Sequence, residues 1–395
     1  MNMPSEVDKG FLEILWQVVF YGWWIFLPIS LYSIFKPLWQ KYVGGLYCAE
    51  SLNMVLLRIK IPQEQITNPK AMESVLMGLS GAGRTITLYE AITKGSFQDY
   101  FSLEIASREG DAAFYVMTPK RSRDLVQKLF YSQFPDIEIV EAPEDYTKAI
   151  PATIPDENWG LWGGKYILEK NQVHPINTYP AFEDKFTGEM VDPLAGLLEA
   201  MGSLGAGEHL WFQIQIASAA PDWRTEGKKA IDDILKKYSL VSSSESSDEV
   251  MTKVLPHHEL EIIKAISSKI SKPAFNTQII FAYIARKEAF NPILAGNVGG
   301  FIKQFESGDL NGFFLDKYYT LSTYYLGAGK RKEYRARRLV DLLRDRDMQG
   351  VCPVLNVEEL ATLFHFPTKM MKVPSIGRLE NKRAPAPPNL PFEEK

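Results

Sequence analysis

The chain has 395 residues with a formal net charge of -4, and 46% of its residues are hydrophobic. This length is sufficient for two or three domains with a sizeable core. The mildly acidic net charge excludes a strong attraction of the whole molecule to nucleic acid, but it does not exclude binding through a local basic patch. The two cysteines, Cys48 and Cys352, lie far apart in the sequence. They indicate reduced thiols in the cytosol and exclude a disulfide framework or a cysteine-rich metal site.

An uncharged, aromatic-rich segment over residues 14–35 follows an N-terminal tail of residues 1–13. A helix of that length crosses a hydrocarbon layer of ~30 Å. We therefore predict a transmembrane helix over 14–35 and a juxtamembrane linker over 36–50. A cleaved signal peptide or a buried core helix is the alternative, but the acidic start disfavours the signal peptide. Lys36 and Lys41 follow the segment, and this lysine bias predicts a single-pass protein of the inner (cytoplasmic) membrane with its C-terminal domains in the cytosol.

Residues 51–145 are predicted to form strand, helix, strand, strand, helix and strand, in that order. Apolar and polar residues alternate in "NMVLLRIKI" and "YFSLEIAS", as in half-buried strands. Asn68 and Pro69 have the residue types that open a helix, and Glu109-Gly110-Asp111 marks a turn between two strands. This order is typical of the split βαβ, ferredoxin-like unit.

A connector over residues 146–164 leads into a second α/β domain over 165–320, which has a mobile polar loop at 239–250. The second domain resembles an elaborated copy of the first. The predicted fold class is therefore α+β, with a transmembrane helix followed by two ferredoxin-like units.

The stretch "GLSGAGRT" (78–85) fits the phosphate loop G-x-x-x-x-G-K-[ST], with Arg84 in place of lysine. A phosphate loop needs a strand before its glycines and a helix N-terminus after them. Here the helix that opens at Asn68 comes first, so Gly81 lies where a helix ends. We therefore predict a helix-terminating loop and no nucleotide site.

Other patterns that carry chemistry are absent from the sequence. None of the five histidines has a partner at H-E-x-x-H spacing, and no G-x-S-x-G element occurs. The prediction is a non-enzymatic protein without a cofactor or a metal.

A basic segment over residues 321–350 is the strongest candidate for contact with a polyanion. Its cations, which surround Tyr334, are Lys330, Arg331, Lys332, Arg335, Arg337 and Arg338. Such a pattern is typical of phosphate contact with base stacking, or of contact with anionic lipid headgroups. A solvated helix with internal ion pairs is the structural alternative. Its candidate pairs join Arg337, Arg338 and Arg344 to Asp341, Asp345 and Asp347.

Two further stretches carry a family resemblance: "DPLAGLLEAMGSLGAGEHLWFQIQIASAAPDW" and "LNVEELATLFHFP". They resemble patterns in large bacterial proteins of the candidate phyla radiation. There they precede a hexameric, DNA-pumping-type ATPase domain related to conjugative coupling proteins and type IV secretion ATPases. The resemblance covers most of residues 10–391. In the longer relatives a segment like "RAPAPPNLP", here in a Pro-rich tail over 371–395, leads into the ATPase. The resemblance thus implies a motor on another chain.

The resemblance also implies a docking role for a helical element over residues 351–370. Asn356 and Glu359 have the residue types and spacing of a capping box, and Pro367 ends the helix. The candidate docking residues are Glu359, Leu360, Phe364, His365 and Phe366. The predicted function is a non-enzymatic component of a type IV secretion or conjugation-like system that docks or scaffolds a partner ATPase. The alternative is a DNA-binding guide module that uses residues 330–338, and self-association is left open.

Overall fold

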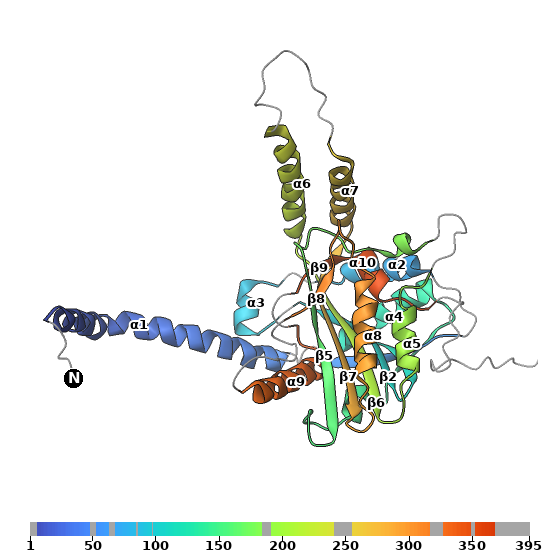
Figure 1. Cartoon of the computed structure of the whole chain (residues 1–395), viewed down its shortest axis with the longest axis horizontal. Coiled ribbons are helices and arrows are strands. Elements are labelled where there is room, and N and C mark those ends of the chain that lie inside the picture. The colour runs from blue at the N-terminus through green and yellow to red at the C-terminus, as the bar shows by residue number, and fades with distance from the viewer. Residues whose placement is uncertain are drawn as a thin grey trace, which may run out of the picture. The chain divides into compact units, whose positions relative to one another are not determined.

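A computed structural model describes residues 6–47, 53–62, 68–83, 86–96, 98–183, 191–240, 255–316, 327–348 and 352–367. The chain divides into two compact units (Figure 1). One comprises Met1–Asn53 and Arg84–Gln98, and the other comprises Met54–Gly83 and Asp99–Lys395. The predicted Pro-rich tail over 371–395 lies outside the described residues, as does the predicted mobile loop from residue 241 onward.

The smaller unit consists of the long helix α1 (Glu6–Tyr47) and the short helix α3 (Leu88–Thr93). The indole Nε1 of Trp39 donates a hydrogen bond to the carbonyl of Ile92 at 3.0 Å. Gly95 has φ +61, and a Cβ there would lie 2.4 Å from the carbonyl carbon of Val43. Glycine at this position therefore lets the segment after α3 contact the C-terminal end of α1.

The predicted transmembrane helix is wrong. Residues 14–35 lie within α1, but no helix in the described part of the chain is both long enough and apolar enough to cross a bilayer. Length alone is insufficient, because a spanning helix must also be apolar over ~20 residues. The single-pass location in the inner membrane, which was inferred from that segment, is corrected with it.

The larger unit is built on one nine-stranded sheet. Its strands are β1 (Met54–Lys60), β2 (Tyr100–Arg108), β3 (Asp111–Pro119), β4 (Glu138–Glu141), β5 (Trp159–Leu168), β6 (Glu208–Ser218), β7 (Ala274–Arg286), β8 (Phe313–Leu315) and β9 (Val354–Asn356). The strand order is β4-β1-β3-β2-β6-β7-β5-β8, with β9 paired to β7, and the paired strands are antiparallel.

The predicted fold class is also wrong, because the strands of both predicted units form a single sheet. β2 and β6 pair along their full lengths, from Tyr100 opposite Ala217 to Arg108 opposite His209. This pairing satisfies the backbone groups that the edge of each separate unit would expose. Outward from it the order is β2-β3-β1-β4 on one side and β6-β7-β5-β8 on the other. The two halves therefore repeat one connectivity inside a continuous sheet.

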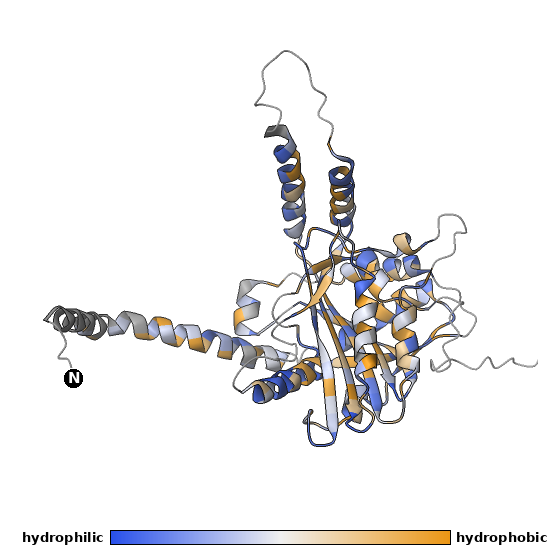
Figure 2. Ribbon diagram, in the orientation of Figure 1, coloured by the Kyte–Doolittle hydropathy of each residue, from blue (hydrophilic) through white to orange (hydrophobic). Residues whose placement is uncertain are grey.

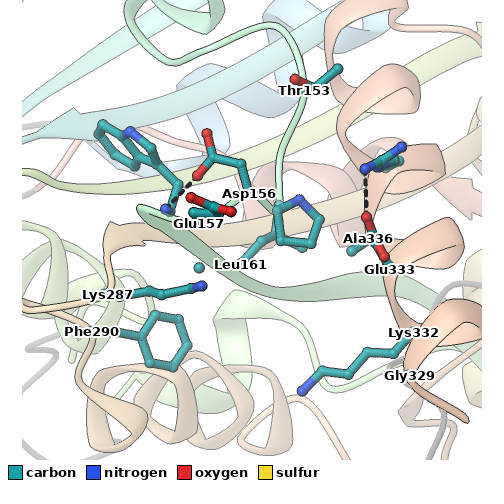
Figure 3. A pocket seen from close by; sticks show the side chains of 14 residues that line it. Thr153, Asp156, Glu157, Leu161, Lys287, Phe290, Gly329, Lys332, Glu333 and Ala336 are labelled. Atoms are coloured by element: carbon teal, nitrogen blue, oxygen red, sulfur yellow. Dashed lines mark hydrogen bonds and ion pairs between the residues drawn. The ribbon is translucent and has the colours of Figure 1, made fainter.

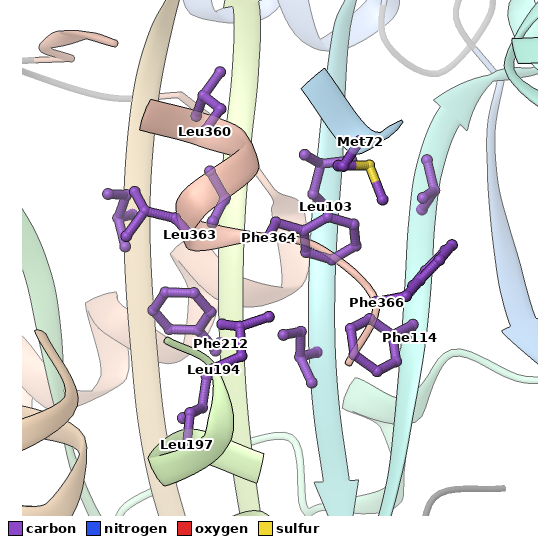
Figure 4. Close-up of a cluster of buried hydrophobic side chains, with 14 of the residues drawn as sticks. Met72, Leu103, Phe114, Leu194, Leu197, Phe212, Leu360, Leu363, Phe364 and Phe366 are labelled. Atoms are coloured by element: carbon purple, nitrogen blue, oxygen red, sulfur yellow. The ribbon is translucent and has the colours of Figure 1, made fainter. Parts of the chain in front are cut away.

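Helices cover both faces of this sheet (Figure 1). The covering helices are α2 (Pro69–Ser80), α4 (Arg123–Gln133), α5 (Ala195–Gly202), α8 (Pro292–Lys303), α9 (Ala328–Asp345) and α10 (Val357–Leu363). The helices α6 (Trp223–Leu240) and α7 (His257–Ser271) lie side by side and project beyond the end of the sheet (Figure 1). One face carries the main core, where Leu360 and Phe364 pack among side chains of the other helices and the strands (Figure 4). On the opposite face α9 covers Trp211 and Ile280. Successive residues of β6 and β7 thus point into two different cores.

Gly163 in β5 permits the close approach of neighbouring groups on the α9 face. A Cβ at this position would lie 2.4 Å from the carbonyl oxygen of Phe281 and 3.0 Å from Cδ2 of Leu339. We expect Gly163→Ala to lower the free energy of unfolding by about 1–3 kcal/mol, because the added methyl group overpacks this contact. Urea unfolding measures the change. Gly196→Ala is the control, since a Cβ there meets nothing within 4 Å. Equal stability of the two variants would contradict the prediction.

Candidate functional site

The predicted basic segment contains α9, whose two sides differ strongly. Its buried side chains, which face the sheet, are Ala336, Leu339, Val340, Leu342 and Leu343. Five of the six predicted cations are exposed: Lys330, Arg331, Lys332, Arg337 and Arg338. Arg335 is half-buried, and Tyr334 is 67% exposed. In Figure 2 one end of α9 is blue, and the apolar residues gather toward the other end. The basic residues therefore form a continuous exposed surface on the first half of the helix.

Ion pairs within α9 account for part of this charge. Arg337 pairs with Glu333 one turn earlier, and both side chains are about half-exposed. Such exposed pairs contribute only about 0.3–0.5 kcal/mol. The structure thus confirms an internal ion pair of Arg337, but its acidic partner is Glu333, whereas the sequence suggested Asp341, Asp345 or Asp347.

A pocket of about 890 Å³ lies beside the first half of α9 (Figure 3). Three segments far apart in the sequence line it: residues 153–161, residues 287–290 and residues 329–337. Lys287 and Lys332 extend toward it from opposite walls (Figure 3). No sequence pattern indicates this pocket, because only the fold brings its three walls together.

A turn centred on Asp156 shapes one wall of the pocket. Asp156 Oδ1 accepts hydrogen bonds from the backbone N–H groups of Asn158 at 2.8 Å and Trp159 at 2.7 Å. Trp159 lines the pocket, and its ring also lies 5.8 Å from the guanidinium of Arg286. The carboxylate therefore fixes the backbone from which the indole projects.

Arg344 ties the segment before this wall to α9. Its guanidinium donates to the carbonyl oxygens of Pro151 at 2.7 Å and Ile150 at 3.3 Å, and to that of Ala152. A single side chain thus satisfies backbone acceptors that have no strand partner. This arginine maintains the structure around the pocket, although the sequence placed it among the candidates for internal ion pairs.

Arg346, immediately after α9, is the most important residue that the sequence did not single out. It has φ 51 and is fully buried. Its guanidinium donates to Glu104 at 2.6 and 3.1 Å and to Asp145 at 2.7 and 3.1 Å. Burial alone would raise the pKa of Asp145, but the hydrogen bonds and charge of Arg346 outweigh it and lower that pKa.

The hydroxyl of Tyr146 continues this buried network across the sheet. It donates to Glu104 at 2.8 Å and accepts from Nε2 of Gln213 at 2.7 Å. The pKa of Tyr146 is raised well above its usual range. Burial is the larger cause, and the nearby negative charge of Glu104 is the second. The tyrosine therefore stays a neutral donor, and the end of α9 is anchored through polar groups of β2 and β6.

The predicted docking residues lie in the core of the chain itself. Glu359, Leu360, Phe364 and Phe366 are fully buried, and His365 is 1% exposed. Glu359 Oε1 lies 3.1 Å from Nζ of Lys269, and His365 Nε2 lies 3.1 Å from Oδ1 of Asp192. The capping box of Asn356 and Glu359 is confirmed. The docking role stays a prediction, and the structure shows only that these five side chains are buried.

The phosphate-loop-like stretch follows a helix, as predicted. Gly78 lies in the last turn of α2, and its carbonyl oxygen accepts a hydrogen bond from the N–H of Gly81 at 3.2 Å. A Cβ at Gly78 would lie 2.3 Å from Cδ2 of Leu129, so packing against α4 explains this glycine. Arg84 lies outside the described residues.

Within the described ranges, no group of three or more His, Cys, Asp or Glu side chains is arranged to hold a metal ion. Comparison with known proteins adds no assignment, since no family model matches the chain and no curated protein matches its sequence. The family resemblance therefore stays a prediction.

Proposed function

We propose that this protein is a nucleic-acid-binding module whose contact surface is the first half of α9. One observation carries the proposal: α9 buries its apolar side against the sheet while its basic side chains stay exposed. A helix held in this way presents its cations on a fixed scaffold.

The chemistry of this surface suits a phosphate backbone. Residues 330–338 contain six cations and one carboxylate, that of Glu333. Lysine and arginine side chains bind phosphates and release condensed counterions, which makes the affinity strongly salt-dependent. The exposed ring of Tyr334 offers a base a stacking surface. Since the chain as a whole carries a charge of -4, the attraction comes from this local surface and is strongest at low salt.

The predicted docking of a type IV secretion or conjugation-type ATPase stays a proposal that rests on the family resemblance. It requires a surface other than α10, because the side chains of that helix are buried. A nucleic-acid-binding role for α9 is compatible with a partner motor that moves DNA.

Reversal of two charges on α9 tests the proposed contact. We expect Lys330→Glu/Lys332→Glu to weaken binding of a labelled oligonucleotide at low salt by at least about tenfold. The slope of log affinity against log salt should fall by about 2, because each lost phosphate contact removes about 0.9. Fluorescence anisotropy over a salt series measures both quantities with the full chain.

The matched control is Lys228→Glu/Lys229→Glu on α6, where both lysines are also exposed. This variant has the same change in net charge, and we expect its affinity to stay within about twofold of the parent, since its lysines are outside the contact surface. An equal loss in both variants would show that net charge alone controls binding. Absence of salt-dependent binding by the parent chain would reject the proposed function.

A further inference from the structure

We propose that the pocket beside α9 holds an unpaired nucleobase, so that the protein prefers single-stranded nucleic acid to duplex. This inference rests on the proposed function, and it names the class of nucleic acid. The pocket volume of about 890 Å³ is within the usual range of ligand-binding pockets. A base stacked inside a duplex has to leave the stack before it can enter such a pocket.

Two aromatic side chains on different segments line the pocket. Trp159 stands at the start of β5, and Phe290 follows β7; both are partly exposed. The ring of Phe290 packs on Tyr283 at 5.1 Å, and that of Trp159 on His209 at 5.8 Å, which holds the rings in place. Aromatic rings bind unpaired bases by stacking, with little dependence on sequence.

The charges in the pocket match a nucleotide better than a simple anion. Lys287 and Lys332 extend into it (Figure 3). Asp156 and Glu157 lie on the wall that carries Trp159, whose backbone N–H donates to Asp156 at 2.7 Å. Carboxylates repel phosphate but accept hydrogen bonds from the amino groups of cytosine or adenine. The base therefore belongs at the Trp159 wall, with its phosphate toward the lysines.

The pocket and the basic surface of α9 are continuous. Lys332 belongs to both, and Ala336 and Arg337 of the next helical turn also line the pocket. A strand whose phosphates follow α9 thus passes the mouth of the pocket. The preference for single strands comes from the pocket, and the salt dependence comes from the helix.

The test compares Phe290→Leu with Phe314→Leu, a control at an exposed phenylalanine of the edge strand β8. The probes are a fluorescein-labelled oligo-dC of about 20 nucleotides, whose bases carry the amino group that the carboxylates accept, and a duplex of the same length. We expect Phe290→Leu to weaken binding of the single strand by about 5- to 100-fold, because stacking of one base is lost. Its duplex binding, and both affinities of Phe314→Leu, should match those of the parent.

Equal affinity of the parent for both probes, or an equal loss on both in Phe290→Leu, would overturn the inference and leave the proposed function standing. No binding of either probe by the parent would reject both. A second measurement uses the unaltered chain and photocross-linking to an oligonucleotide that contains 5-iodocytosine. We expect the cross-linked peptide to contain Trp159 or Phe290, and a cross-link confined to Tyr334 would overturn the inference.

Discussion

Replacement of Arg346 by methionine is expected to lower the free energy of unfolding by about 3–5 kcal/mol. The guanidinium is fully buried and forms bidentate hydrogen bonds with Glu104, which is also fully buried. Methionine fills a similar volume but leaves the buried Glu104 carboxylate without its counter-charge, with the Tyr146 hydroxyl as its remaining described donor. The cost of that unpaired charge makes this one of the two largest effects we expect.

The control for this prediction is Arg337→Met, which removes the half-exposed pair with Glu333. We expect that variant to lose less than about 1 kcal/mol, because water screens an exposed ion pair. The double variant Arg346→Met/Glu104→Gln should be more stable than Arg346→Met alone, since it removes the unpaired charge as well. Chemical unfolding of the three variants measures these differences. Similar losses in Arg346→Met and Arg337→Met would contradict the assignment.

The same network predicts a dependence of stability on pH. The pKa of Asp145 is lower in the folded chain than its usual value of 3.8. Its contribution to stability is therefore fully present above the unfolded pKa and is lost as the pH falls through the folded pKa. In Arg346→Met the lowered pKa loses its main cause, so we expect a shallower loss of stability on acidification below about pH 4.

Replacement of Lys269 by methionine is the second substitution with a large expected effect, again about 3–5 kcal/mol. Lys269 and Glu359 are both fully buried, and their charged atoms lie 3.1 Å apart. Glu359 also accepts the backbone N–H of Ile176 at 2.9 Å and that of Asn356 at 2.8 Å. Loss of the lysine leaves the Glu359 carboxylate buried with only neutral hydrogen-bond donors. The packing of α10 in the core is thereby weakened.

The control here is Lys264→Met, because Lys264 and Glu261 form an exposed pair on the same helix, α7. We expect it to cost less than about 1 kcal/mol. Thermal unfolding of both variants at one pH compares them directly. A loss in Lys264→Met as large as that in Lys269→Met would reject the assignment.

Glu359→Gln should differ from Lys269→Met in its pH dependence. Burial lowers the pKa of Lys269, and the charge of Glu359 partly restores it. Glutamine at position 359 keeps the capping hydrogen bond but removes the negative charge, so the pKa of Lys269 falls further. The unfolded chain then binds more protons than the folded chain below the usual lysine pKa of 10.5. Stability should therefore rise with pH up to that value, more steeply than in the parent.

Local features of the fold could be read from the sequence because their causes lie within a few residues. The side chain of Asn68 caps α2, with Pro69 in the first turn, and Asn356 and Glu359 form the predicted capping box. Glu109 and Gly110 adopt positive φ in the turn between β2 and β3. At the caps the residue type supplies the hydrogen bond, and in the turn Gly110 favours the positive φ, whereas Glu109 adopts it without such a preference.

The second face of the sheet could not be predicted in this way. Alternation in "YFSLEIAS" assigns Phe101 and Leu103 to a core and leaves Ser102 and Glu104 on the opposite face, yet all four are buried. Glu104 is covered by Arg346, which lies 242 residues later in the chain. The alternation of apolar and polar residues indicates which residues share a face of the strand. Whether that face is buried depends on where a helix from a distant part of the chain packs.

By itself, the sequence determined the order of the four strands within residues 51–145, the caps of α2 and α10, and the concentration of positive charge in residues 330–338. It did not indicate the strands β5, β8 and β9. Hydrophobic periodicity and capping act over a few residues, so no long-range contact is needed to read them. Tertiary structure alone decided the rest: the β2–β6 pairing that joins the halves, the burial of the predicted docking residues, and the pocket built from three distant segments. These features depend on which distant surfaces exclude water from one another, and composition and spacing do not specify that.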